Sequence, residues 1–256
     1  WTQQKDRWLS MDDWDKCNKE VDEQTLIGRE CYIGLDLSSK LDLTALAMVF
    51  PPQTDELWQL VVRCYIPRDS MQERERVERI PYSKWERHGW ITPTDGDVID
   101  YDFILADIAR LSDEYDVQEV AFDPWSAQQT AIKVRDDIGL PVVPMRQGFM
   151  SLSEPTKEFE RLVVSGKLAH GSNSCMSWMV SNCSVRHDPA GNLKPEKGKS
   201  TRHKIDGVVA SIMAIGRATL REHSASIYED EVLRYLKNIY ADIHQTYTVP
   251  FFLTKS

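Results

Sequence analysis

The sequence predicts an α/β protein built on a mixed sheet, in which antiparallel strands are followed by parallel strand–helix units and helices flank the sheet. Two observations support this class. Short apolar runs joined by brief connections fill residues 31–66, and strand and helix patterns alternate over residues 117–147. With 256 residues, 41% of them hydrophobic and 28% charged, the composition is that of an ordinary globular protein. We expect one sizeable domain with appended ends.

The first part of the predicted sheet comes from three apolar runs. These are CYIGLDLSS from residue 31, LDLTALAMVF from residue 41, and ELWQLVVRCYI after the turn-like PPQTD. Consecutive strands with short connections pair antiparallel. Residues 69–90 are dense in charge, and we expect an exposed helix followed by an irregular segment. Apolar residues near helical spacing predict a helix over residues 101–115.

The second part of the predicted sheet is parallel. VQEVAFD is typical of a strand, SAQQTAIKVRDDIG of a helix closed by Gly139, and PVVPMRQ of a further strand. The next helix is expected to begin at Ser153 as N-cap, with Pro155 in its first turn. SCMSWMVSNC predicts another helix, and DPAGN indicates the turn of a hairpin. From Ile205 onward, an almost wholly apolar run predicts a helix packed against the sheet.

The two ends differ from the predicted domain, which we place at residues 29–222. Residues 1–28 are polar with scattered tryptophans, and we expect a linker or docking segment. Residues 223–256 form an expected C-terminal tail. No stretch approaches the roughly 18 apolar residues of a membrane span, and the first residues lack a signal peptide's apolar core, so we expect an intracellular protein. The five cysteines never form a C-x-x-C pair, which favours reduced packing residues over disulfides or zinc.

Three aspartates interrupt apolar surroundings at comparable places. Asp36 lies in the first predicted strand, Asp123 at the carboxyl end of a later strand, and Asp206 at the start of the last apolar helix. Burying a carboxylate is costly unless a cation or hydrogen bonds compensate, so three such interruptions suggest one shared site. Hard oxygen ligands favour Mg²⁺ or Mn²⁺ over zinc. An aspartate at such a place, taken alone, is more often a helix cap or a turn residue.

Four strings in order, CYIGLDLSSKLDLTALAMVFP, VAFDPW, LSEPTKEFERLVVSGKLAHG and KIDGVVASIMAIGRA, resemble the C-terminal nuclease domain of phage terminase large subunits of the HK97-like type. The resemblance covers about residues 28–218. It implies a ribonuclease-H-like fold and a metal-dependent endonuclease that cuts double-stranded viral DNA during genome packaging. By the same resemblance, the acids of GLDLS, FDPW and KIDG bind the catalytic metals, which here are Asp36, Asp123 and Asp206.

The resemblance also implies partners and a mechanism. The partners would be double-stranded DNA, a small terminase subunit, the portal protein and other large subunits, in the cytoplasm of an infected bacterial host. Two Mg²⁺ or Mn²⁺ ions would activate water and stabilise the leaving oxygen, with no protein nucleophile. Asp42 matches an acid that some family members place near the metals, although a turn residue is an equally good interpretation.

A basic cluster stands out in this acidic chain, whose net charge is −9. It precedes Asp206 on the expected hairpin, where it is the best candidate for contact with DNA phosphates. A solvated charge run is the alternative, and Lys204 could instead orient phosphate or water. The cluster comprises Lys194, Lys197, Lys199, Arg202 and Lys204.

Other function classes remain open at this point. YIGLDLSS also resembles the first phosphate loop of actin-like sugar kinases, but no second glycine-rich loop follows. A non-catalytic DNA-binding or motor-docking module is a second alternative, distinguished by a failure to bind Mn²⁺. Resolvases and integrases of the same fold use similar acids. Gly198-Lys199-Ser200 is not a P-loop, since the spacing from Gly191 is wrong, so we expect a carboxyl-terminal portion without the packaging ATPase.

Overall fold

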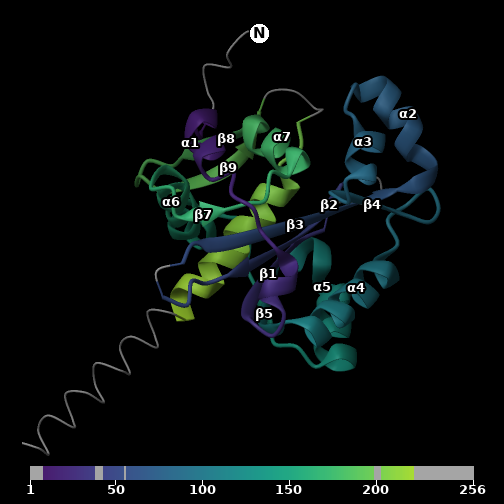
Figure 1. Cartoon of the computed structure of the whole chain (residues 1–256), viewed down its shortest axis with the longest axis horizontal. Helices are drawn as coiled ribbons and strands as arrows, with labels where there is room; N and C mark the ends of the chain where they lie inside the picture. The colour runs from purple at the N-terminus through teal and green to yellow at the C-terminus, as the bar shows by residue number, and fades with distance from the viewer. Residues whose placement is uncertain (1–7, 38–42, 55, 199–202, 222–256) are drawn as a thin grey trace, which may run out of the picture. The chain divides into compact units, whose positions relative to one another are not determined.

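The computed structural model describes residues 8–37, 43–54, 56–198 and 203–221. The chain divides into two compact units, Trp1–Ala218 and Thr219–Ser256. Of the second unit only residues 219–221 are described, and every described strand belongs to the first unit (Figure 1).

A mixed sheet forms the centre of this first unit. Its strands run in the order β4-β3-β2-β1-β5-β6, and β7 pairs with β3 at one end. Pairing is antiparallel among β1, β2 and β3, whereas β5 is parallel to β1 and β6 is parallel to β5. This arrangement confirms the predicted antiparallel part followed by a parallel part. The strands are β1 (Glu30–Asp36), β2 (Thr44–Phe50), β3 (Trp58–Pro67), β4 (Ile91–Thr94), β5 (Asp116–Phe122), β6 (Val142–Pro144) and β7 (Leu168–Ala169).

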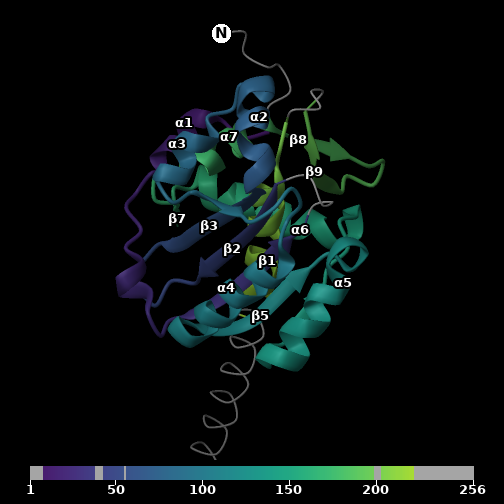
Figure 2. The same cartoon turned by 90° about the vertical axis from the view of Figure 1, so that its right-hand side faces the viewer.

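Helices cover both faces of the sheet, because alternate strand residues are apolar on opposite sides. Tyr32 belongs to one core cluster and Ile33 to the other. The Ile33 face packs under α4 (Tyr101–Glu114) and α5 (Pro124–Lys133). Figures 1 and 2 show these two helices on one side of the sheet and α6 and α7 on the other. The Tyr32 face packs under α1 (Met11–Lys16), α6 (Phe149–Val164), α7 (Ser174–Asn182) and the helix over 206–221.

The segment expected to link or dock contributes to the first core cluster. Trp14 is fully buried there, and its indole N–H donates to Ser177 Oγ at 2.9 Å. Leu9 and Cys17 are buried beside it. The short η1 helix (Glu23–Leu26) then leads to β1. Residues 1–7 of this segment lie outside the described part of the chain.

Two expectations about local structure were wrong. The segment expected to be irregular after α2 (Arg68–Glu78) contains α3 (Tyr82–Arg87) and leads into strand β4, because Tyr82 and Trp85 bury their rings and anchor the chain. The helix α6 begins at Phe149 and not after Ser153. Ser153 is buried inside it, and its hydroxyl accepts the amide N–H of Leu193 at 3.2 Å.

Two further elements follow the predicted pattern. The helix α5 continues into η2 (Val134–Ile138) and ends at Gly139, whose φ of 85° is the left-handed conformation that favours glycine. The DPAGN turn joins β8 (Cys183–His187) to β9 (Leu193–Lys197) in a separate two-stranded hairpin. All five cysteines are buried with free thiols. Among the described residues, no helix is both long and apolar enough to cross a membrane.

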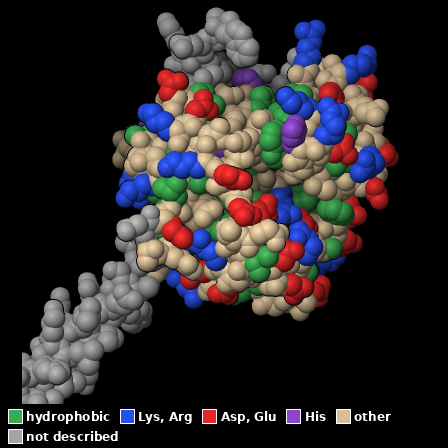
Figure 3. Space-filling model, in the orientation of Figure 1, with side chains coloured by type: hydrophobic (Ala, Val, Ile, Leu, Met, Phe, Trp, Pro, Cys, Tyr) green, Lys and Arg blue, Asp and Glu red, His purple; other side chains and the backbone are tan. Residues whose placement is uncertain are grey.

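The surface carries charges of both signs. Figure 3 shows basic and acidic side chains interspersed over the face in view, which agrees with the net charge of −9. No broad positive area covers the described part of this face, so any contact with a polyanion there has to be local.

Candidate metal centre

The candidate site forms where the parallel strands end. Leu35 of β1 is in register with Phe122 of β5, and Phe122 with Pro144 of β6. The carboxyl ends of these strands therefore meet at one edge of the sheet, where ligands of such sheets commonly bind. Asp36 is the last residue of β1 and Asp123 directly follows β5, so the two acids stand at the ends of adjacent strands. After β6, the amide N–H of Met145 donates to the Phe122 carbonyl at 2.8 Å, which keeps the next loop at the same edge.

Asp36 projects toward the helix over 206–221, because it shares the face of Tyr32 and Gly34 along β1. Its carboxylate is partly buried. The side-chain amide of Gln147 donates a hydrogen bond of 2.7 Å to Asp36 Oδ1. The strand therefore sets the direction of this carboxylate, and Gln147 fixes its orientation.

Asp206 reaches the same place through unusually close packing of a helix on a strand. A Cβ on Gly34 would lie 1.9 Å from the backbone oxygen of Ala210. Only a glycine allows this approach. Asp206 begins the helix one turn before Ala210 and is 4% exposed. The contact between Gly34 and the helix thus brings the second carboxylate over the end of β1.

The carboxylates of Asp36 and Asp206 lie close enough to repel each other. Burial raises the pKa of Asp36 to about 8, and the negative charge of Asp206 adds to that rise. The hydrogen bond from Gln147 and the positive charge of Lys197 lower the pKa of Asp36, and Asp123 makes the smallest contribution, which raises it. Two carboxylates that repel each other in a partly buried site favour a bound cation.

Asp123 occupies a different position from the other two acids. It is the N-cap of α5, and its Oδ1 accepts the amide N–H of Trp125 at 3.1 Å. This is the capping role left open in the sequence analysis. Within the described residues, no group of three His, Cys, Asp or Glu side chains is arranged to hold a metal ion. The structure therefore brings Asp36 and Asp206 into one cavity and leaves Asp123 at the neighbouring strand end.

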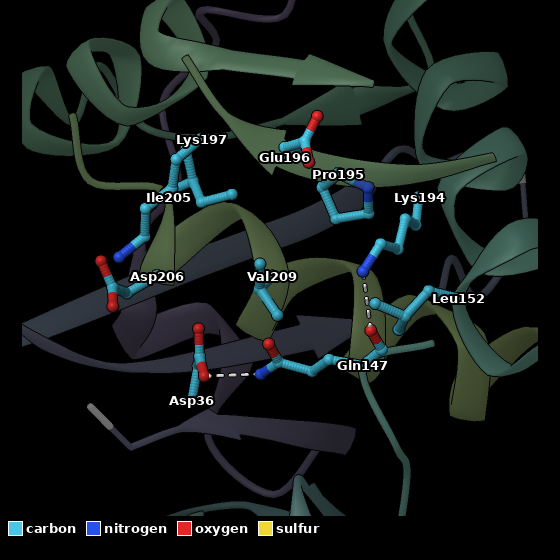
Figure 4. A pocket seen from close by; sticks show the side chains of 10 residues that line it. All are labelled: Asp36, Gln147, Leu152, Lys194, Pro195, Glu196, Lys197, Ile205, Asp206 and Val209. Atoms are coloured by element: carbon cyan, nitrogen blue, oxygen red, sulfur yellow. Dashed lines mark hydrogen bonds between the residues drawn. The ribbon is translucent and has the colours of Figure 1, made fainter. Parts of the chain in front are cut away.

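The cavity has a volume of about 430 Å³. Figure 4 shows Asp36 and Asp206 facing it from β1 and from the helix, with the hairpin strand β9 on its far side. Its lining combines carboxylates, two lysines and a few apolar side chains. The lining residues are Asp36, Gln147, Leu152, Lys194, Pro195, Glu196, Lys197, Ile205, Asp206 and Val209.

The basic cluster divides into parts with different surroundings. Lys194 donates to the backbone carbonyl of Gln147 at 3.4 Å, and its ammonium lies 5.5 Å from the centre of the Phe149 ring. Lys197 points toward Asp206 (Figure 4). Lys204 is buried, with 8% of its surface exposed. The other two members of the cluster, Lys199 and Arg202, lie outside the described residues, as does the candidate ligand Asp42.

Gln147 is a site residue that the sequence interpretation missed. A signal was present in the sequence, because Gln147 follows the strand run PVVP much as Asp123 follows VQEVAF. Polar residues just beyond the carboxyl ends of parallel strands face the crevice where ligands bind. A criterion based on charged side chains alone does not single out a neutral amide.

Comparisons with known proteins agree with this geometry. A family model described as "Terminase large subunit, endonuclease domain" matches residues 1–222. The large terminase subunit of Enterobacteria phage HK97 is 36% identical over 213 residues, which cover 82% of this chain and 41% of that protein. Protein YmfN of Escherichia coli strain K12 is 30% identical over 234 residues, covering 87% of this chain and 50% of that protein.

The structural comparison points the same way. The crystal structure of the HK97 large terminase matches with a TM-score of 0.74 and 34% sequence identity, covering 82% of this chain and 43% of that chain. This chain therefore spans about half the length, or less, of the relatives it matches.

Proposed function

The chain belongs to the family of terminase large subunit endonuclease domains, and from this premise we propose that it hydrolyses the backbone of double-stranded viral DNA during genome packaging. Its reaction centre is the cavity that holds Asp36 and Asp206. The observation that carries the proposal is the convergence of these two carboxylates, from β1 and from the helix over 206–221, in one cavity where each raises the cost of charging the other.

The residues fit a hard divalent cation. Carboxylate oxygens are the ligands that Mg²⁺ and Mn²⁺ prefer. Asp36 and Asp206 would hold such an ion between them, and a cation would remove the repulsion that raises the pKa of Asp36. We assign Asp123 as a further ligand through its second carboxylate oxygen, since Oδ1 caps α5. Two ions, Mg²⁺ or Mn²⁺, are proposed.

Bound ions would supply a water of lowered pKa and polarise the scissile phosphate. The chain itself has to place the DNA and keep the carboxylates ionised. Lys194, which lines the cavity from β9, is assigned a contact with a backbone phosphate. Gln147 and Lys197 both favour the charged form of Asp36. No side chain is proposed as a nucleophile.

We propose the partners from the family alone, because this chain spans only about half, or less, of the length of its relatives. They are double-stranded DNA, a small terminase subunit, the portal protein and other large subunits, in the cytoplasm of an infected bacterium. Coupling of cleavage to a packaging motor belongs to the same set of proposals.

The test pairs Mn²⁺ calorimetry with a plasmid-nicking assay on Asp36→Asn, Asp206→Asn and Asp123→Asn. Asparagine is itself a good N-cap, so the third variant keeps α5 intact while it removes the charge. We expect each variant to lose nicking, and Mn²⁺ affinity to fall at least about 10-fold, because each loses a ligand charge.

The matched control is Asp116→Asn, which lies at the amino end of β5, opposite the site. It is expected to bind Mn²⁺ and cut as the wild type does. A wild-type chain that binds duplex DNA but neither Mn²⁺ nor Mg²⁺ would contradict the proposal and support the non-catalytic docking module instead.

A further inference from the structure

Gln147 is the only neutral hydrogen-bonding side chain among the described residues that line the cavity. It lies in the loop between β6 and α6. Its amide nitrogen donates to Asp36 Oδ1 at 2.7 Å, so one of the two oxygens of that carboxylate has a fixed partner. Figure 4 shows the amide oxygen of Gln147 turned into the cavity, away from Asp36. The side chain therefore spans the gap between the strand-borne acid and the open space.

The loop that carries Gln147 is held on both sides. At its start, the amide of Met145 donates to the carbonyl of Phe122 at 2.8 Å, which continues the alignment of β6 with β5. At Gln147 itself, the backbone carbonyl accepts Lys194 Nζ from β9 at 3.4 Å. Directly after it, Gly148 accepts the first helical hydrogen bond of α6, from Leu152 at 3.0 Å. These contacts place the amide before any ligand binds.

The chemistry of an amide suits this position. An N–H donor stabilises an ionised carboxylate and orients it. A lysine or arginine in the same place would do so too, but its full positive charge would repel an incoming cation. A neutral donor orients the Asp36 carboxylate without adding a positive charge to the cavity.

We propose that Gln147 is a positioning residue that orients Asp36 as a metal ligand through this hydrogen bond. The inference rests on the proposed function, since it concerns the same cavity. Partners that orient metal-binding side chains typically change metal affinity about 10–100-fold when they are removed. Gln147 acts through Asp36, and the chain needs no DNA for this effect to appear.

Mn²⁺ binding to the DNA-free protein tests the inference. In Gln147→Met the side chain keeps its length and loses the amide, and in Gln147→Asn the amide is kept but is one methylene too short to reach Asp36. Both variants are expected to bind Mn²⁺ about 10-fold or more weakly. In an Asp36→Asn background, Gln147→Met should weaken Mn²⁺ binding no further, because Gln147 acts through the Asp36 carboxylate.

Gln118→Met is the matched control. Gln118 is partly exposed on β5, and its side-chain amide donates within its own strand, to the carbonyl of Asp116, so Mn²⁺ affinity should stay at the wild-type value. Wild-type Mn²⁺ affinity in folded Gln147→Met and Gln147→Asn, or an equal loss of affinity from Gln147→Met in the Asp36→Asn background, would overturn the inference while the proposed function stands. Absence of Mn²⁺ binding by the wild-type chain would overturn both.

Discussion

Asp36 shows how one residue can link the site to the stability of the fold. In the metal-free protein its pKa is about 8 instead of its ordinary 3.8, chiefly because of burial and then because of the charge of Asp206. At pH values between 3.8 and about 8, Asp36 is therefore protonated in the folded state and ionised in the unfolded state. Stability from this group is fully present below about pH 4 and declines as the pH rises toward 8. A bound cation that replaces the proton should restore this stability at high pH.

We therefore predict different pH profiles for the wild type and Asp36→Asn in EDTA. Near pH 5, where Asp36 is protonated, the wild type and Asp36→Asn should have similar melting temperatures. At pH 8.5 the melting temperature of the wild type should lie below that of Asp36→Asn by about 3 °C or more, which is on the order of 1 kcal/mol for a domain of this size. Thermal melts at both pH values measure this. Adding Mn²⁺ at pH 8.5 should raise the melting temperature of the wild type more than that of Asp36→Asn. Melting temperatures that change in parallel with pH in the two proteins would contradict the prediction.

At the scale of elements, one contact decides whether the site exists. The helix over 206–221 lies so close to β1 that the backbone oxygen of Ala210 occupies the space a Cβ on Gly34 would need. Asp206 precedes this contact by one helical turn, and Asp36 follows it by two strand residues. Any displacement of the helix from the strand therefore separates the two carboxylates.

Gly34→Ala should consequently destabilise the fold by about 3 kcal/mol, the upper part of the range for overpacking, because the methyl group meets backbone that cannot rotate away. Denaturant unfolding measures the change. The remaining folded protein should bind Mn²⁺ more weakly, since the helix has to shift.

A second substitution separates backbone from side-chain crowding. Ala210→Gly removes a methyl group at the contact but leaves the carbonyl oxygen in place, so Gly34→Ala with Ala210→Gly should be no more stable than Gly34→Ala alone. Recovery of stability in the double variant would show that the clash is with the side chain of Ala210 and would refute this account.

At the scale of the whole molecule, the chain has the mixed sheet of the terminase nuclease family, and its HK97 relative shares that fold over 82% of this chain. The family assignment leaves the sugar-kinase alternative without support. Under the proposed function, an acidic protein of net charge −9 has to approach a polyanion. The hairpin β8–β9, with Lys194 at the cavity and the cluster that continues beyond it, is the proposed local contact.

We predict that Lys194→Gln with Lys199→Gln weakens binding to unrelated duplex sequences equally, and flattens the slope of log affinity against log salt by about 0.9 for each DNA phosphate that the protein ceases to neutralise. Fluorescence anisotropy with a labelled duplex at several salt concentrations in EDTA measures this without cleavage. The control is Lys16→Gln with Lys133→Gln, two ion-paired lysines on α1 and α5, which removes equal charge elsewhere. Equal slopes of log affinity against log salt in both double variants would show that the basic cluster makes no specific contact with DNA phosphates.

The sequence by itself determined the parts of this protein that depend on local pattern. The short apolar strands, the crossover helix closed by Gly139 and the DPAGN hairpin were all predicted, because local hydrophobic pattern and turn chemistry specify them. It also identified Asp36, Asp123 and Asp206 as candidates, since a carboxylate in an apolar run is conspicuous wherever it folds.

Only the tertiary structure decided which of these side chains meet. Asp36 and Asp206 are 170 positions apart, and their meeting depends on strand register and on the space left by Gly34. The start of α6 was misplaced for a related reason: Ser153 is a good N-cap by local chemistry, yet burial of Leu152 and the bond from Leu193 to the Ser153 hydroxyl place it inside the helix. Gln147 has a weak sequence signal in its place beyond a strand end, but only the structure showed its contact with Asp36. Long-range packing has no local sequence signal, because it depends on which faces of distant elements can approach each other without steric clash.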